Sequence, residues 1–405
     1  MKSVKSIISI VLCLCVLSCS RCIAAKTVSS ECDIEDINVP IPTSSNDAAQ
    51  GVTLEINAKS AILMEPKTGE ILYEMNSNEP LPPASITKIM SLLLIMEAID
   101  SGSLTVEDVV STSEHAASMG GSQIWLEPGE SMTVDDLLKA TVIASANDAT
   151  VALGEYITGS EEGFVAMMND KAKSLGMNNT TFINCTGLDA EGHITTAHDV
   201  AIMSSELIKH PLIKKYSTVW MDTLRDGESE LVNTNKLVRF YEGTTGLKTG
   251  TTSKAGYCLS ATAEKNGTEM VAVIMGGNTS DDRFAGAKKL LDYGFANFSF
   301  MTVAPKLEKD TYIKVENGVS KQVRVDVSDS FDVLLKKGQS GEISQKMNLK
   351  QKLSAPVKKG DTVGTVDIYS GNTHIGSVKV TAGHNVDKIS FSTTLLWLVK
   401  GLFTP

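Results

Sequence analysis

The sequence is poor in the features that mark disulfide-stabilised and metal-binding proteins. It has seven cysteines in 405 residues, and four of them lie in the first 22 positions. The others, Cys32, Cys185 and Cys258, form an odd and scattered set, which favours neither a disulfide framework nor a metal site. After residue 25 the chain contains no CxxC or HxxxH pair. We therefore expect no metal and no cofactor.

Positive charge is also scarce. The whole chain has 37 basic and 48 acidic residues, and the first 25 positions hold three of the basic residues and no acidic one. The remainder therefore carries 34 basic against 48 acidic residues, a net charge of −14. A chain this acidic is not expected to bind nucleic acid.

The N-terminus has the pattern of an export signal. Lys2 and Lys5 precede an apolar run from Ile7 to Leu17, and small residues follow at 24 and 25. This pattern is typical of a cleavable signal peptide over residues 1–25 and indicates an exported protein. Lipidation at Cys19 is an alternative, although Leu17 is bulky where a small residue would be expected. Residues 26–47 mix Ser, Asp, Pro and Asn and are interpreted as a linker.

The middle of the chain alternates helical and strand-like patterns. Apolar alternation around a Pro-Lys-Thr-Gly turn predicts a β-hairpin at 59–75, and two further runs predict strands within 256–277. Helical spacing is found at 85–101, 133–156, 161–175 and 281–297. A hairpin, several helices and then more strands predict an α+β fold, with helices packed on an antiparallel sheet.

After residue 300 the pattern changes again. Short alternating runs separated by Gly, Asn and Asp turns predict a small all-β domain over 303–385. Residues 388–405 place six apolar residues along one side of an expected helix, which is too short to cross a bilayer. This stripe favours an amphipathic helix that binds the membrane surface over one that docks on the protein itself.

A serine followed three residues later by a lysine, at the start of an apolar helix, suggests a nucleophile and its base. Ser85 and Lys88 would share one helix face, close enough to exchange a proton. Burial against an apolar helix lowers the pKa of a lysine, which would let Lys88 accept that proton. Taken alone the pair is a weak signal, because a serine cap followed by a surface lysine gives the same pattern.

Two later motifs strengthen this hypothesis. Ser145-Ala146-Asn147 follows a helical segment, and Lys248-Thr249-Gly250 precedes a strand-like run. Such a set is the signature of class A β-lactamases and penicillin-binding proteins. Similar tripeptides also occur by chance at Ser44, Lys67 and Ser370. Only the motifs beginning at 85, 145 and 248 come in the expected order within one domain.

In these motifs the chain resembles the serine-type D-alanyl-D-alanine carboxypeptidases, which are the low-molecular-mass penicillin-binding proteins. The segments that carry the resemblance are PASITKIM, ASANDA, LGMNNTTFINCTGLD, TTAHD, GLKTGTT and TSDDRF. The resemblance implies a penicillin-recognising, β-lactamase-like catalytic domain at 48–300. It also implies peptidoglycan stems ending in D-Ala-D-Ala as substrate, β-lactams as covalent inhibitors, and a location at the outer face of the cytoplasmic membrane or in the cell wall.

The resemblance and the residue chemistry together suggest catalytic roles. Ser85 would attack the carbonyl between two D-alanines and form an acyl-enzyme, while Lys88 takes its proton. Ser145 would relay a proton to the leaving nitrogen, and Asn147 would hold Lys88 and the substrate backbone. Lys248 would add positive potential that keeps Lys88 deprotonated and attracts the terminal carboxylate.

The substrate-binding residues come from the third motif and its surroundings. Lys248, Thr249 and Thr251 would bind the terminal carboxylate, and Gly250 would let the substrate backbone approach the strand. Backbone NH groups of Ser85 and Thr251 would form the oxyanion hole. Arg283 matches an arginine of the family and would support carboxylate recognition. A surface ion pair with a neighbouring aspartate is its alternative.

Two further residues have open interpretations. His193 either shapes the cleft or is a hydrogen-bonded loop residue, and we assign it no proton-transfer role. Trp125 either forms a cleft wall or packs in the core. A class A β-lactamase would need a Glu-x-x-Leu-Asn pattern between the second and third motifs, and none is present. A non-catalytic wall-binding scaffold would not need the intact Ser85 and Lys88.

Overall fold

The computed structural model describes residues 53–307, 311–327, 330–338 and 342–395. The predicted signal peptide and linker lie outside these residues, as do residues 396–405 of the expected tail helix. The structure therefore addresses the predicted catalytic and all-β segments.

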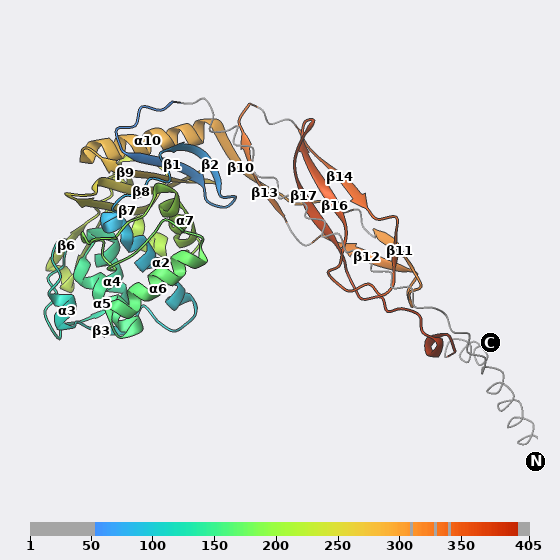
Figure 1. Ribbon diagram of the computed structural model, residues 1–405, viewed down its shortest axis with the longest axis horizontal. Helices are drawn as coiled ribbons and strands as arrows, with labels where there is room; N and C mark the ends of the chain where they lie inside the picture. Colours follow the sequence, from blue (N-terminus) through green and yellow to red (C-terminus); the bar gives the residue numbers. More distant parts are fainter. Residues whose placement is uncertain (1–52, 308–310, 328–329, 339–341, 396–405) are drawn as a thin grey trace, which may run out of the picture. The chain divides into compact units, whose positions relative to one another are not determined.

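A five-stranded antiparallel sheet is the centre of the first segment, with strand order β2-β1-β9-β8-β7 (Figure 1). The predicted hairpin at 59–75 and the paired strands within 256–277 are both confirmed. The strands are β1 (Ser60–Glu65), β2 (Glu70–Met75), β7 (Thr244–Thr252), β8 (Gly256–Lys265) and β9 (Thr268–Gly277).

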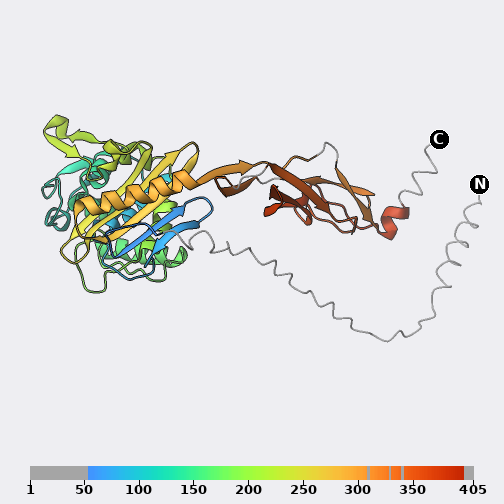
Figure 2. The same cartoon turned by 90° about the horizontal axis from the view of Figure 1, so that it is seen from above.

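Helices cover both faces of this sheet, as Figure 2 shows for α10 (Ser280–Asn297). Helix α10 packs on β8 and β9, and α7 (Ala197–Leu207) packs on β9 and β1 from the other face. Strand β9 is consequently buried along its whole length, which explains why it reads as a continuous apolar run. The predicted helix at 281–297 is confirmed.

The helical region differs from the sequence prediction in two places. The expected helix at 85–101 starts with a 3₁₀ turn, η2 (Ala84–Thr87), and continues as the buried helix α2 (Lys88–Asp100). The pattern at 133–156 suggested helix throughout, but the chain forms α4 (Val134–Lys139), a π-helical turn η3 (Ala140–Ala144) and α5 (Asn147–Thr158). The break falls at Ser145, whose φ of 64° is left-handed and cannot continue a helix.

Smaller elements complete this region. The predicted helix at 161–175 is α6 (Glu161–Ser174). The others are β3 (Val109–Ser111), α3 (Glu114–Ala117), β4 (Ser131–Thr133), α8 (Ile213–Ser217), β5 (Met221–Leu224), η4 (Arg225–Gly227), β6 (Ser229–Val232) and α9 (Leu237–Phe240).

The second segment is all-β, and the α+β fold class is confirmed. Its main sheet has the order β14-β16-β17-β12-β11-β15, and β10 pairs with β13. Strand β10 spans the predicted boundary between 300 and 303. The strands are β10 (Phe298–Val303), β11 (Tyr312–Glu316), β12 (Gln322–Asp326), β13 (Phe331–Lys336), β14 (Ile343–Leu349), β15 (Lys352–Ser354), β16 (Thr362–Ser370) and β17 (Thr373–Ala382).

The described part of the expected tail helix is short. Residues 391–395 are helical, and Phe391 is 84% exposed. Within the described residues, we find no helix with the length and apolar character needed to span a membrane.

Candidate active site

The first motif forms a sharp turn that presents Ser85 at the entrance to a buried helix. Ala84 has a φ of 49°, a left-handed conformation that is unusual for a residue with a side chain. Ser85 lies in η2, and Lys88 is the first residue of α2. Lys88 Nζ is 3.1 Å from Ser85 Oγ. The structure therefore brings the predicted nucleophile and base into hydrogen-bond contact.

Lys88 has three hydrogen-bond partners. Its Nζ lies 3.1 Å from Ser85 Oγ, 2.5 Å from Asn147 Oδ1 and 2.8 Å from the carbonyl oxygen of Thr186. An amide oxygen and a carbonyl oxygen can only accept, whereas a serine hydroxyl can also donate. When Lys88 is neutral its two N–H groups satisfy the two obligatory acceptors, so its lone pair points to Ser85. Loss of one proton would thus leave Lys88 able to accept a proton from the Ser85 hydroxyl, as the sequence predicted.

Burial makes this neutral form accessible. Lys88 is fully buried, and desolvation lowers the pKa of its ammonium to about 7. Cys185 and Asp148 oppose this shift by favouring the charged form. Lys88 therefore titrates near neutral pH, where an ordinary lysine stays charged.

The second motif lies where the helix prediction failed. The left-handed Ser145 ends the π-helical turn, and Asn147 begins α5. Asn147 donates through Nδ2 to the carbonyl oxygen of Gly120 at 2.6 Å, which orients its Oδ1 toward Lys88. Ser145 Oγ is buried and has no hydrogen-bond partner among the described residues. The structure thus joins Asn147 directly to Lys88, and Ser145 stands beside them with its hydroxyl unpaired.

The third motif lies in strand β7, against the turn that carries the nucleophile. A Cβ atom on Gly250 would come within 2.9 Å of the backbone nitrogen of Ser85 and 3.0 Å of the carbonyl oxygen of Pro83. Glycine is therefore needed so that the strand can approach this turn. Thr249 Oγ1 donates to Thr234 Oγ1 at 2.7 Å. The expectation that Gly250 also admits the substrate backbone stays a prediction.

Lys248 is as buried as Lys88, with 1% of its surface exposed, and its Nζ donates to the carbonyl oxygen of Thr249 at 3.1 Å. Its pKa is lowered well below the usual value by burial first, and then by the charges of Lys88 and Arg283. The lowering of the Lys88 pKa itself comes from burial. Because the two ammonium groups repel each other, we infer that the pair holds fewer than two protons at neutral pH.

Arg283 reaches strand β7 from helix α10. Its Nη1 donates to the carbonyl oxygens of Gly250 at 3.1 Å and Cys258 at 3.3 Å, and to Thr251 Oγ1 at 2.9 Å. The residue is only 8% exposed, and its Nε has no partner among the described residues. The alternative of a surface ion pair with a neighbouring aspartate is therefore wrong, and Arg283 adds fixed positive charge beside Thr251.

Two family models and several known proteins are similar to this chain. Residues 44–279 match the family model for D-alanyl-D-alanine carboxypeptidases, and residues 298–388 match the C-terminal domain of penicillin-binding protein 5. The D-alanyl-D-alanine carboxypeptidase DacF of Bacillus subtilis is 44% identical over 88% of this chain and 92% of its own. DacC of Escherichia coli is 34% identical over 83% and 86%.

This chain belongs to the D-alanyl-D-alanine carboxypeptidase family. Solved structures agree: penicillin-binding protein 5 of Haemophilus influenzae has a TM-score of 0.75 at 30% identity, covering 84% of this chain and 100% of its own. Penicillin-binding protein D2 of Listeria monocytogenes, solved with ampicillin bound, has a TM-score of 0.55 at 33% identity and covers 60% of this chain and 100% of its own. The resemblance stated from the motifs is thus confirmed.

Within this carboxypeptidase, His193 is a buried structural residue close to the nucleophile. Its Nδ1 accepts from the backbone N–H of Ile183 at 3.1 Å, so the ring proton is assigned to Nε2, which lies 2.8 Å from Thr87 Oγ1. Burial lowers the pKa of His193 to about 4, which keeps the ring neutral. Since Thr87 lies between Ser85 and Lys88, we assign His193 to holding the turn in place.

Sequence reasoning missed two contributions from the loop near 186. The carbonyl oxygen of Thr186 is a partner of Lys88, and a backbone atom leaves no residue signature. A Cβ on Gly187 would lie 1.8 Å from the carbonyl oxygen of Ala84, and its φ is +89°. The signal that could have found this loop is Gly187 itself, because glycine is the residue suited to a left-handed conformation with such a close approach.

The two chance tripeptides within the described residues lie away from this site. Lys67-Thr68-Gly69 forms the turn between β1 and β2, and Ser370-Gly371-Asn372 lies where β16 turns into β17. The motif at Ser44 lies outside the described residues. Trp125 is 75% exposed, so the alternative that it packs in the core is wrong.

Proposed function

We propose that this carboxypeptidase removes the terminal D-alanine from peptidoglycan pentapeptide stems through an acyl-enzyme on Ser85, and that penicillins acylate the same serine. The observation that carries the proposal is the contact of the buried Lys88 Nζ with Ser85 Oγ, Asn147 Oδ1 and the Thr186 carbonyl oxygen. With the two obligatory acceptors satisfied, the neutral amine has its lone pair left for Ser85. This arrangement activates a hydroxyl that would otherwise be a weak nucleophile.

The proposed reaction begins with proton transfer from Ser85 Oγ to Lys88 Nζ as the oxygen attacks the carbonyl carbon. The C–N bond to the last D-alanine then breaks as Ser145 Oγ delivers a proton to the leaving nitrogen, and Lys88 passes the proton it took from Ser85 to Ser145. Asn147 holds Lys88 and the substrate amide. Water then attacks the ester carbon and gives a proton to Lys88. The C–O bond to Ser85 breaks, Lys88 returns this proton to Ser85 Oγ, and the shortened stem leaves. Export of the protein would place it beside this substrate in the cell wall.

Substrate orientation is assigned to the β7 side of the cleft. The terminal carboxylate would accept hydrogen bonds from Thr249 and Thr251, in the positive field of Lys248 and Arg283. The two hydroxyl protons would turn to the carboxylate from Thr234 Oγ1 and the Gly250 carbonyl oxygen, to which they point in this structure. Arg283 is positioned for this role by its contact with Thr251. The backbone NH groups of Ser85 and Thr251 would stabilise the developing oxyanion, a contribution of about 3 kcal/mol.

Mass spectrometry of a pentapeptide wall fragment tests the reaction, and labelled penicillin tests the nucleophile. We expect loss of one alanine from the fragment and one penicillin adduct per chain. Ser85→Ala should abolish both, because no other group is aimed at the carbonyl carbon. The control Ser174→Ala removes an exposed hydroxyl at the end of α6 and should change neither.

Three outcomes would contradict the proposal. Penicillin labelling of Ser85→Ala at the wild-type level would show that the nucleophile is misassigned. A wild-type protein that binds penicillin but never shortens the fragment would favour the non-catalytic scaffold. Sustained penicillin hydrolysis in place of a long-lived adduct would favour a β-lactamase.

We also propose that residues 1–25 direct export and that residues 388–405 hold the enzyme at the outer face of the cytoplasmic membrane. In this scheme residues 26–47 are a linker, 48–300 the catalytic domain and 303–385 the β domain. The exposed Phe391 and Leu395 support the anchor. Ile389 still bonds to the β domain through Asn317, so the test is truncation after Ser390.

Truncation after Ser390 should release the protein from membranes while carboxypeptidase activity survives. The double change Phe391→Ser and Leu395→Ser should weaken binding to lipid vesicles in the same direction, because it removes apolar surface that would enter the membrane. Unchanged membrane retention in both variants would refute the anchor.

A further inference from the structure

Trp125 combines high exposure with an unusual backbone conformation. Its side chain is 75% exposed, and its φ of 59° is left-handed. For a large side chain this conformation is a steric outlier that persists only when the surrounding structure enforces it. Core packing does not explain either property.

The buried carboxylate of Asp148 fixes the loop from one side. It accepts from the backbone N–H of Ile124 at 3.1 Å and from that of Leu126 at 3.1 Å. These are the two residues that flank Trp125. The hydrogen bonds hold the backbone on both sides of the tryptophan and leave its side chain free.

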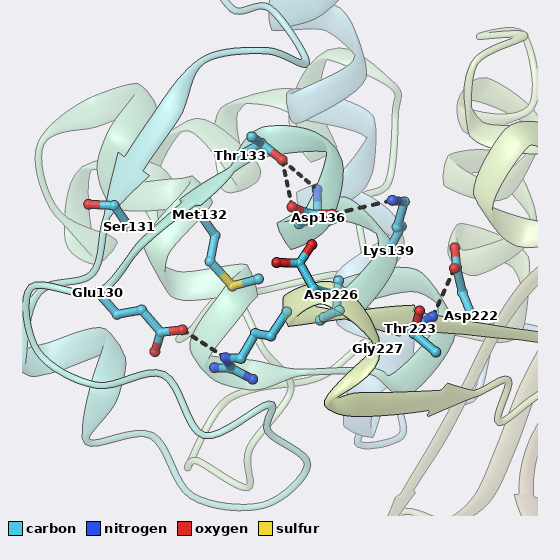
Figure 3. Close-up of a pocket in the computed structure, with 12 residues that line it drawn as sticks. Glu130, Ser131, Met132, Thr133, Asp136, Lys139, Asp222, Thr223, Asp226 and Gly227 are labelled. Carbon is cyan, nitrogen blue, oxygen red and sulfur yellow. Dashed lines mark hydrogen bonds and ion pairs between the residues drawn. The ribbon is translucent and has the colours of Figure 1, made fainter.

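Arg225 fixes the loop from the other side. Its Nη1 donates to the carbonyl oxygen of Ile124 at 3.0 Å and its Nη2 to that of Trp125 at 3.5 Å. Its Nε forms an ion pair with Glu130 at 2.8 Å. Arg225 and Glu130 line a pocket of about 630 Å³, and Figure 3 shows Glu130 among the side chains around it. Arg225 lies in η4, between β5 and β6, and its contacts join this turn to the Trp125 loop and to Glu130.

The same loop is tied to the catalytic asparagine. The backbone N–H of Asn147 donates to the carbonyl oxygen of Ser122 at 2.7 Å, and its Nδ2 donates to that of Gly120. Asp148, which fixes the Trp125 backbone, is the next residue after Asn147. Trp125 is therefore an exposed aromatic ring on a rigid support that shares its attachment points with the active site.

We propose that the Trp125 indole binds the side chain of the third residue of the stem peptide, where peptidoglycan carries a diamino acid. This inference rests on the proposed function, which places the terminal carboxylate at Thr249 and Thr251. We place the rest of the peptide along the loop that contacts Asn147 through Gly120 and Ser122. Successive residues of an extended peptide lie about 3.5 Å apart, and the third residue is the first beyond D-Ala-D-Ala, so we assign its side chain to Trp125.

The chemistry of the third residue suits an indole. Its alkyl chain can pack on the ring, and its terminal ammonium is attracted to the ring face by a cation–π interaction. A methyl group, as in alanine, offers neither contact. Trp125 would thus select stems with a long cationic side chain, while the reacting residues treat all D-Ala-D-Ala ends alike.

The test compares two tripeptides, acetyl-L-Lys-D-Ala-D-Ala and acetyl-L-Ala-D-Ala-D-Ala. Trp125→Asn removes the ring but keeps a residue that tolerates the left-handed conformation. We expect kcat/KM for the lysine peptide to fall about fivefold, the size of an exposed cation–π contact. For the alanine peptide, kcat/KM should change less than about 1.5-fold, because its methyl group cannot reach the ring.

Three controls accompany this variant. Trp125→Phe should retain most of the preference, because a phenyl ring offers the same kind of contact. Tyr312→Ala removes an exposed aromatic ring from strand β11 of the β domain and should change neither peptide. Acylation by 6-aminopenicillanic acid, which has no acyl side chain, should be equal in all variants and reports that the cleft is intact.

Equal losses on both peptides in Trp125→Asn would overturn the proposal. If the wild type releases D-alanine from neither peptide, the proposed function fails, and the binding arm decides the inference separately. In that arm, the lysine peptide should change the tryptophan fluorescence of the wild type but not of Trp125→Asn. A fluorescence change that survives in Trp125→Asn would also overturn the proposal.

Discussion

The chain contains the tripeptide Lys-Thr-Gly twice, and the two copies have opposite surroundings. In the β1–β2 turn, Lys67 is exposed and its Nζ lies 4.3 Å from the centre of the Phe300 ring, while Thr68 bonds to the carboxylate of Glu65. In strand β7, Lys248 is buried and repelled by Lys88. The first copy stabilises a turn, and the second lies against the turn that carries Ser85.

The difference teaches that burial, rather than residue type, gives the lysine of this motif a shifted pKa and a strong electrostatic field. An exposed lysine stays charged and solvated, so it offers neither a titratable group at neutral pH nor an undamped field. Lys248 is buried beside Lys88 and Arg283, so its pKa is lowered well below the usual value and its charge is poorly screened. Each copy is therefore a natural control for the other, because the same substitution can be made in both.

The largest contrast is expected between the two lysines. Lys248→Ala should lower the rate of penicillin acylation about 1000-fold, or ~4 kcal/mol, because the carboxylate loses its buried positive partner. Lys67→Ala should stay within about twofold, as expected for a surface site. Stopped-flow acylation measures both, and thermal unfolding checks that each variant folds. Comparable losses in the two variants would break the contrast.

A pH profile provides the next contrast. Lys88 must be neutral to accept a proton, and its pKa is about 7, so acylation should fall as the pH drops below 7. At pH 5 about 1% of Lys88 would remain neutral, which predicts a rate about 100-fold below the plateau. Lys67→Ala should keep this profile unchanged. A rate that is flat from pH 5 to 8 would remove Lys88 as the base.

The two glycines should differ by a smaller factor. Gly250→Ala forces a Cβ against the backbone of Ser85 and Pro83 and should slow acylation about tenfold while lowering the melting temperature. Gly69 has a φ of +73° and open space around its Cα. Gly69→Ala should therefore cost about 1 kcal/mol of stability through the left-handed conformation alone, with normal activity. Normal acylation by Gly250→Ala would contradict the close approach.

The two threonines should show the smallest contrast. Thr249→Val removes a hydroxyl from the expected carboxylate site, which should raise KM about fivefold, because Thr251 and the nearby positive charges still hold the carboxylate. Thr68→Val removes a donor to Glu65 and should lower only the free energy of unfolding, by about 1 kcal/mol. Steady-state kinetics and urea unfolding separate the two effects. If KM rose equally in Thr68→Val, the rise in Thr249→Val would reflect lost stability and not a lost contact with the carboxylate.

Periodicity and motif order predicted much of this architecture. The hairpin at 59–75, the strands within 256–277 and the helix at 281–297 each have a regular pattern that their burial enforces, and the structure confirms them. The break at Ser145 could not be read in this way. Its left-handed backbone is imposed by the packing around it, and the residues 133–156 carry a helical pattern on both sides of the break.

The residue types of the candidate site could be predicted from the sequence, but the contacts between them could not. The sequence order selected Ser85, Lys88 and Lys248 over the chance copies of the motifs. The carbonyl of Thr186, the clamp of His193 on Thr87 and the contacts of Arg283 all depend on segments far apart in the chain. Such contacts require the tertiary fold, because no local pattern states which backbone atom will face a side chain.

The unpaired Ser145 hydroxyl has a consequence for ligand recognition. This buried hydroxyl has no partner among the described residues, so it depends on a water or a ligand for its hydrogen bond, and leaving it unpaired costs about 1–3 kcal/mol. A ligand that displaces such a water keeps its affinity only if it bonds to Ser145 in the water's place. Ligands that fill the cleft without reaching Ser145 should bind more weakly than their contact area suggests.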